Sequence, residues 1–324
     1  MPWFSEVIDE CNNEQGWTPL LWAATKKHMT IVKTLIEHGA TPLKAKGDGM
    51  NIMHVAASSN DIHVLDYVIN LVKNQESTPK DFIDIQNTDG WTPAHLASFM
   101  GNFDSLSLLI DHGADLVNKK HAHKMSCVDE IVRNDNADLL ECVYPFVHQS
   151  LQKRNIREVG SFSLLHLAAG NNGSKSLKYL LESNGEYVNQ ICNEQDRATP
   201  LHFAILANNY DNARLLLKHQ ANANARDSQG NTPMHFAVAA KNLSMVRMLD
   251  DYGANATIKN NDGYCPIDVS VTEDLRDIKM HFVAQQKYKN FDFTGIGLAS
   301  AAEVTDENFE QPKANKGRSS SYYR

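Results

Sequence analysis

Residues 224–253, NARDSQGNTPMHFAVAAKNLSMVRMLDDYG, decide the fold. Thr232 followed by Pro233 favours a helix start, because the threonine hydroxyl can cap free backbone N–H groups and proline has none to lose. After a break at 241–242, apolar residues recur at helical spacing up to Gly253, a residue suited to ending a helix. The stretch therefore predicts two short helices joined by tight turns, a unit too small to bury its own apolar faces.

The same unit recurs along most of the chain. The positions equivalent to Thr232 are Thr18, Asn51, Thr92, Ser126, Ser163, Thr199 and Cys265. The steps between successive positions are 33, 41, 34, 37, 36, 33 and 33 residues. A period near 33 residues with the pattern T-P-L-H-x-A marks ankyrin repeats, and residues 9–290 resemble that family. The resemblance implies an all-α solenoid of about eight helix-turn-helix repeats with turn or β-hairpin tips.

Three regions follow from this spacing. Residues 1–16 are expected to fold back as a cap on the first repeat, since an end repeat has an uncovered face; the alternative is a short partner-binding motif. The solenoid occupies 17–290, and residues 291–324 form a C-terminal extended tail with too few apolar residues for a core.

Repeat 4, near residues 119–160, departs furthest from the pattern. Its turn contains no glycine, and its first helix carries Glu130 and Ile131, the latter where most repeats have alanine. Pro145 is expected to kink or end the second helix. We therefore expect this repeat to have the weakest interfaces, so that the array bends or opens here.

Composition limits the function. The formal net charge of −8 disfavours a general nucleic-acid binder, which needs a basic surface to neutralise phosphates. No apolar run approaches the length of a membrane span, and no signal peptide is expected at the N-terminus. The five cysteines are scattered without a C-x-x-C pair, which indicates a reducing environment and hence a cytoplasmic location. Such a location is compatible with a place in a cytoskeletal or other large assembly.

The chain has many histidines, but their positions do not predict a metal site or a catalytic site. Five of the fourteen occupy one position of the repeat, where a ring can bond to the turn and link neighbouring repeats: His54, His95, His166, His202 and His235. His121-x-His123 is a local pair without a third metal ligand, so it is a weak metal candidate beside two alternatives, a basic tip for an acidic partner and a solvated loop. No catalytic arrangement stands out, and we expect no enzyme activity, cofactor, metal or small-molecule substrate.

Binding is expected on the concave face, which in ankyrin-repeat proteins is formed by the turn tips and the first helices. Aromatic residues can anchor an interface, and those at the tips are Trp17, Trp91, Phe162 and Tyr264. The alternative is that they shield neighbouring turns. A basic tip and the tail supply further candidate contacts: Lys119, Lys120, His121, His123, Lys124, Phe291 and Phe293.

These features favour a non-catalytic protein–protein scaffold or adaptor, a subunit of a larger assembly. The alternative is a reversible regulatory binder that holds an enzyme or a transcription factor inactive. Neither the period nor the composition names the partner, because one repeat scaffold serves many.

Overall fold

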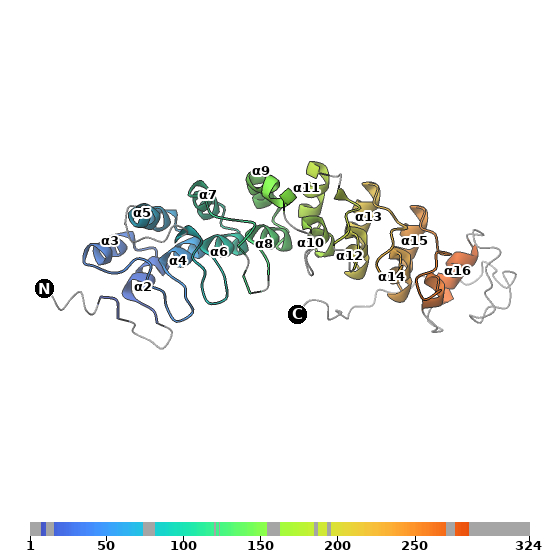
Figure 1. Ribbon diagram of the computed structural model, residues 1–324, viewed down its shortest axis with the longest axis horizontal. Helices are drawn as coiled ribbons and strands as arrows, with labels where there is room; N and C mark the ends of the chain where they lie inside the picture. The colour runs from blue at the N-terminus through green and yellow to red at the C-terminus, as the bar shows by residue number, and fades with distance from the viewer. Residues whose placement is uncertain are drawn as a thin grey trace.

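The computed structural model describes residues 8–10, 16–73, 82–119, 121–122, 124–153, 163–184, 187–192, 196–269 and 276–284. The described helices form one elongated array in which each repeat adds a pair (Figure 1). The first helices are α2 (Pro19–Thr25), α4 (Ile52–Ser59), α6 (Pro93–Met100), α8 (Cys127–Arg133), α10 (Leu164–Gly170), α12 (Pro200–Leu206), α14 (Pro233–Ala239) and the 3₁₀ helix η3 (Pro266–Val269). The second helices are α3 (Met29–Glu37), α5 (Ile62–Lys73), α7 (Phe103–Asp111), α9 (Ala137–Lys153), α11 (Lys175–Asn184), α13 (Tyr210–Lys218), α15 (Leu243–Asp251) and α16 (Arg276–Ala284).

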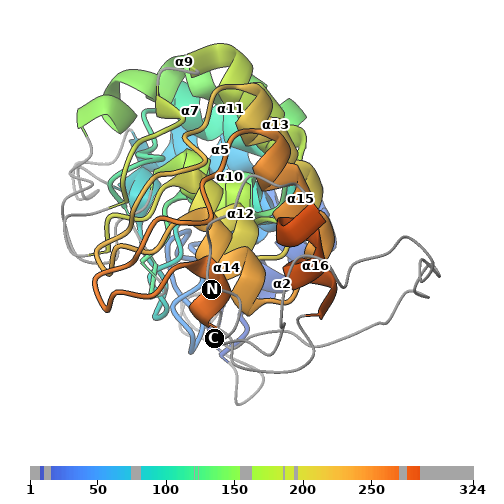
Figure 2. The same ribbon diagram turned by 90° about the vertical axis from the view of Figure 1, so that its right-hand side faces the viewer.

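The two rows of helices have different positions in the array. In Figure 1 the second helices run along one edge, the first helices lie beneath them, and the tip loops project beyond the first helices. Viewed along the array, the pairs stack behind one another (Figure 2). Each first helix from α2 to α12 packs against the first helix of the next repeat and against its own second helix. One continuous apolar core therefore runs the length of the solenoid, as the period predicts.

Small residues let neighbouring first helices approach. In six repeats an alanine lies five positions after the residue equivalent to Thr232. All six alanines are buried: Ala23, Ala56, Ala97, Ala168, Ala204 and Ala237. In repeat 4 the equivalent Ile131 is also completely buried, so α8 accommodates the larger side chain within the same core.

The tips are tight turns, and the described residues contain no β-strand. The turns still carry hairpin-like bonds, such as Asn87 N–H to the Trp91 carbonyl at 2.9 Å, and lateral bonds, such as Thr88 N–H to the Asp48 carbonyl at 3.0 Å. Gly90 adopts a φ of +81° within its turn. Lys124 takes the equivalent place in repeat 4 with a φ of +62°, so that turn forms without glycine.

The structure corrects one expectation about repeat 4. The expectation that Pro145 could end the second helix is wrong, because α9 continues through it from Ala137 to Lys153. Val143 and Val147 are buried on either side of the proline, and this packing offsets the backbone hydrogen bond that proline cannot make.

At the N-terminal end, the described part of the lead-in lies against repeat 1. Ile8 is buried in the core, and the Asp9 carboxylate accepts the Thr41 N–H at 3.1 Å. Both contacts fit the cap expected for residues 1–16. The boundary at 290/291 lies outside the described residues and stays a prediction.

Candidate functional site

The five histidines of the repeat pattern join consecutive repeats. In each, Nε2 lies 3.0–3.3 Å from a backbone carbonyl in the tip of the next repeat, with acceptors Trp91, Met125, Ala198, Asn231 and Tyr264 in turn. Nδ1 faces the start of its own helix; in His235 it accepts the Thr232 N–H at 3.0 Å. The prediction that these residues link the repeats is confirmed.

This bonding fixes the protonation state of the rings. The carbonyl requires a hydrogen on Nε2, and in four of the rings a backbone N–H requires a lone pair on Nδ1, so the neutral ring fits both. In His166 the partner of Nδ1 is instead the Ser163 hydroxyl oxygen, at 2.7 Å. Burial lowers the pKa of His95 and of His166 to about 4, and it also lowers the pKa of His54, His202 and His235. Because both nitrogens are engaged, these rings serve structure rather than metal binding or proton transfer.

The described tip aromatics differ in exposure. Trp17 is half-buried, with its ring centroid 5.0 Å from that of Trp22 and 4.7 Å from Lys46 Nζ. Trp91 is half-buried, whereas Tyr264 is 55% exposed. Trp17 and Trp91 are therefore partly covered, and Tyr264 is the most open of the three. Phe162 lies outside the described residues, as do Phe291 and Phe293.

One residue of the basic tip of repeat 4, His121, does not lie on the surface as expected from the sequence. The His121 side chain is fully buried, its Nε2 lies 3.0 Å from Glu130 Oε1, and its ring stacks on Trp91 at a centroid distance of 4.6 Å. His121 is thus unavailable to a partner, because a buried carboxylate from α8 draws it inward. Lys119 is half-buried and Lys124 is exposed, while Lys120 and His123 lie outside the described residues.

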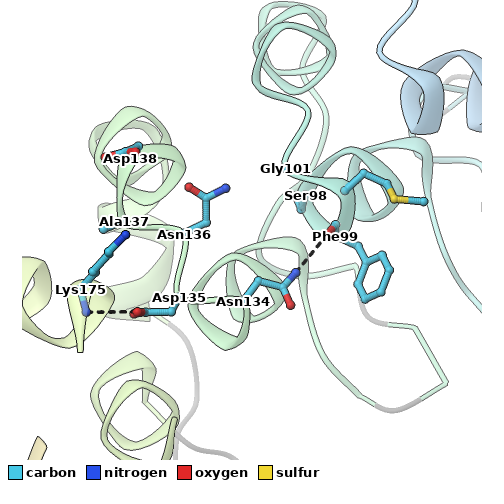
Figure 3. A pocket seen from close by; sticks show the side chains of 10 residues that line it. Ser98, Phe99, Gly101, Asn134, Asp135, Asn136, Ala137, Asp138 and Lys175 are labelled. Atoms are coloured by element: carbon cyan, nitrogen blue, oxygen red, sulfur yellow. Dashed lines mark hydrogen bonds between the residues drawn. The ribbon is translucent and has the colours of Figure 1, made fainter. Parts of the chain in front are cut away.

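Sequence reasoning missed a second surface, at the loop between the two helices of repeat 3. Phe99 and Met100 end α6 with exposures of 46% and 56%, and Phe103 begins α7 with 46%. A hollow of about 320 Å³ lies on the repeat 4 side of this loop, and one of about 410 Å³ lies between α5 and α7. Figure 3 shows the first, where α6 faces the α8–α9 loop and the start of α11.

The signal for this surface was present in the sequence. Phe99 occupies a position that is threonine, serine, arginine, glycine, leucine or alanine in the other repeats, whose residues are Thr25, Ser58, Arg133, Gly170, Leu206 and Ala239. A comparison of exposed positions along the repeats, rather than of the T-P-x-H positions, would have found it.

Within the described residues, no three His, Cys, Asp or Glu side chains come together as a metal site would require. Over the same residues, no helix is long and apolar enough to cross a membrane. Four cysteines are free thiols there: Cys127, Cys142, Cys192 and Cys265.

Comparison with known families identifies the repeat. The family described as "Ankyrin repeats (3 copies)" matches residues 4–81, 43–120 and 165–262. These matches leave out residues 121–164, which hold most of repeat 4. Among solved structures, the ankyrin repeat domain of Bcl-3 aligns with a TM-score of 0.61 and 24% identity over 72% of this chain and 99% of that one, which shows a shared fold.

Curated relatives share the repeats but little else of their length. The NAD-dependent deacetylase sir2B of Dictyostelium discoideum is 27% identical over 207 residues, which are 61% of this chain and 24% of that protein. The nuclear factor NF-kappa-B p105 subunit of Gallus gallus is 26% identical over 140 residues, 43% of this chain and 14% of that protein. The chain therefore spans well under two thirds of these relatives, and the similarity lies in a module built into proteins of different kinds.

Proposed function

Because the chain belongs to the ankyrin-repeat family, whose repeats bind other proteins, we propose that it is a non-catalytic adaptor held in a larger assembly. The observation that carries this proposal is a series of exposed apolar side chains on the first helices and tips. They come from repeats 1, 3, 6 and 8 and are Trp22 at 40%, Phe99 at 46%, Leu206 at 52% and Tyr264 at 55% exposure. Large exposed apolar residues on a rigid surface are typical anchors of protein interfaces.

The proposed contact has two parts. The first is this face together with Lys124 at the tip of repeat 4, which is exposed. The second is the tail of residues 291–324, with its apolar start and its basic end at Lys313 and Lys316. Two tethered contacts raise the overall affinity without requiring one tight site.

The test is cross-linking mass spectrometry on the full chain isolated with its native partners. We expect cross-links to one partner both from Lys124 and from Lys313 or Lys316. Isolation as a free monomer without links between proteins would contradict the assembly subunit and would favour a reversible regulatory binder.

Substitutions test the face itself. We expect the double change Trp22→Ala with Leu206→Ala to weaken partner retention by at least about tenfold, because the loss of even one interface anchor has an effect of this size. Ile31→Ala is the matched control, since Ile31 is 49% exposed but lies on the second helix α3. Equal loss of the partner in the control would refute binding through the first-helix face.

A further inference from the structure

The hollow beside α6 joins three repeats. It is lined by Ser98, Phe99, Met100, Gly101, Asn134, Asp135, Asn136, Ala137, Asp138 and Lys175, and its volume is about 320 Å³. These residues end α6, form the α8–α9 loop and begin α11 (Figure 3). The hollow lies on the edge of the array where first and second helices connect, away from the tips.

Ser98 supplies the main reason to regard the hollow as a binding site. Its side chain is 1% exposed, and its hydroxyl has no hydrogen-bond partner. The other repeats place hydrocarbon at this position: Ala24, Ala57, Val132, Ala169, Ile205 and Val238. A buried hydroxyl without a partner destabilises the folded state, so the repeat architecture does not explain it.

The asparagine bridges between repeats change position around the hollow, and the bridge made by Asn134 recurs at its equivalent Asn171, which donates to the Val132 carbonyl. In repeat 3 the Asn102 side chain donates to the Ala57 and Ser58 carbonyls of the preceding repeat, at 2.9 and 2.8 Å. At the next junction the bridge comes from Asn134 instead, whose Nδ2 donates to the Phe99 carbonyl at 3.1 Å. Asn136, which is equivalent to Asn102, uses its side-chain oxygen to cap α9 at Leu139. Figure 3 shows Asn136 and Ser98 on opposite sides of the open centre.

The charges around this edge favour a cation. Asp135 and Asp138 line the hollow, with Lys175 as the one ammonium group among its lining residues. The Asp135 carboxylate already accepts the backbone N–H groups of Lys175 and Ser176, so Asp138 supplies the second carboxylate. The neighbouring hollow between α5 and α7 adds three carboxylates and one histidine, from Asp66, Asp104, Asp111 and His63. Exposed apolar side chains flank both hollows, so a ligand meets acidic and apolar groups together.

We propose that the hollow receives an arginine side chain from a partner protein, with an adjacent apolar residue of the partner on Phe99 and Met100. This inference deepens the proposed function, since it rests on the chain binding proteins. A planar guanidinium offers five N–H donors to the acceptors that line the hollow, such as Ser98 and Asp138, whereas lysine offers three. The apolar rim and the neighbouring carboxylates then select a basic segment that also carries apolar residues.

The experiment uses the full chain labelled with ¹³C at its methionine methyl groups. Met100 reports on the hollow, and its signal is assigned with Met100→Leu. The probe is the peptide acetyl-Phe-Arg-Leu-amide, and its control contains citrulline, which has a similar shape but no charge. We expect a saturable shift of the Met100 signal with the arginine peptide and at least about tenfold weaker binding of the citrulline peptide, because hydrogen bonds to charged groups contribute the most.

Two charge variants should change the affinity for the arginine peptide in opposite directions. Asp138→Asn should weaken binding of the arginine peptide about tenfold through loss of a charged acceptor. Lys175→Ala should strengthen binding, because it removes a like charge, and Lys178→Ala on the same helix should leave it unchanged. The reverse signs would assign the hollow to an anion and overturn the proposal.

Ser98→Ala separates binding from folding. The variant should bind the arginine peptide more weakly and yet melt at the same or a higher temperature, since alanine occupies this place in other repeats. Unchanged peptide affinity in this variant would refute a ligand at the Ser98 hydroxyl. If the Met100 signal does not shift but the chain is isolated with a stable native partner, the arginine site is refuted and the proposed function stands. If the Met100 signal shifts but the chain is isolated without any partner, the proposed assembly subunit is refuted and the arginine site stands.

Discussion

Acidification should loosen the solenoid through the histidines that join its repeats. His166 is the best case, because its side chain is buried, its Nε2 lies 3.1 Å from the Ala198 carbonyl, and burial lowers its pKa to about 4. Above pH 6.5 the ring is neutral in both the folded and the unfolded chain, so its pKa shift costs nothing. As the pH falls below 6.5, the unfolded chain takes up a proton that the folded chain resists, and stability is lost until the pH reaches about 4.

The size of the effect follows from the two pKa values. Between an unfolded pKa of 6.5 and a folded pKa of about 4, one such histidine costs about 2 kcal/mol of stability at pH 5. His95 contributes a similar loss, because its pKa is also lowered to about 4 by burial, with the neighbouring His121 adding to the shift. Asp and Glu side chains with ordinary pKa values stay mostly ionised at pH 5, so the histidines dominate this window.

The decisive variant is His166→Leu, because Leu21 occupies the same position in repeat 1 and is buried there. It should be less stable than the parent chain at pH 7, having lost a bond between repeats, but its stability should fall by about 2 kcal/mol less between pH 7 and pH 5. His63→Leu on the exposed face of α5 is the control and should keep the full pH dependence.

Hydrogen exchange gives the sharper assay, because repeat arrays need not unfold in one step. The opening free energy of the α10 amides, corrected for the intrinsic exchange rate at each pH, should fall on acidification in the parent chain and much less in His166→Leu. An equal fall in both would show that the titration of His166 does not govern the stability of this repeat.

Further predictions concern the turns and the repeat 4 junction. Lys124→Gly should stabilise the chain by about 0.5–1 kcal/mol in urea unfolding, because glycine accepts the positive φ without strain; lower stability would contradict this. Gly90→Ala should cost about 2 kcal/mol or more, since its φ is +81° and an added Cβ would lie 2.9 Å from the His121 Cα; an unchanged melting temperature would argue against it. Amides of α8 and α10 should exchange faster than those of α12 and α14, because Asp129 stands where five of the repeats have the linking histidine; equal protection would refute a weak junction.

The period made the fold predictable from the sequence. T-P-x-H predicts a capped helix start and a ring that reaches the next tip, and both features appear in repeat 3, where Thr92 caps α6 and His95 bonds to the Met125 carbonyl. These interactions are local or lie one repeat apart, so a sequence pattern can carry them. Where one residue is replaced, as with Lys124 at a glycine position, the neighbouring repeats still impose the turn.

The candidate site was less predictable, because it depends on pairs that no short pattern contains. The prediction that His121 is exposed in the basic tip was wrong. Its partner Glu130 lies nine positions later in the sequence, and only the fold brings the two side chains together. The hollow beside Ser98 combines residues from three repeats, and none of them belongs to the T-P-x-H pattern. The sequence pattern therefore predicted the repeat fold and the histidines that link the repeats. It did not predict the surface formed by residues that depart from the pattern.

Departures from the repeat become informative once their cost is considered. Repeat 4, most of which the ankyrin family match leaves out, buries His121 and Glu130, but the two side chains bond to each other. Such a pair preserves the fold, although the second carboxylate oxygen of Glu130, Oε2, is buried without a hydrogen-bond partner. The Ser98 hydroxyl is buried with no partner, and Phe99 and Met100 expose apolar surface where other repeats have mostly small or polar residues. These changes offer the solenoid no gain in stability, so we infer that the benefit comes from a bound partner. By this reasoning the departures in repeat 3, where an unpartnered hydroxyl lines a hollow beside exposed apolar side chains, mark the surface where partner binding should be sought.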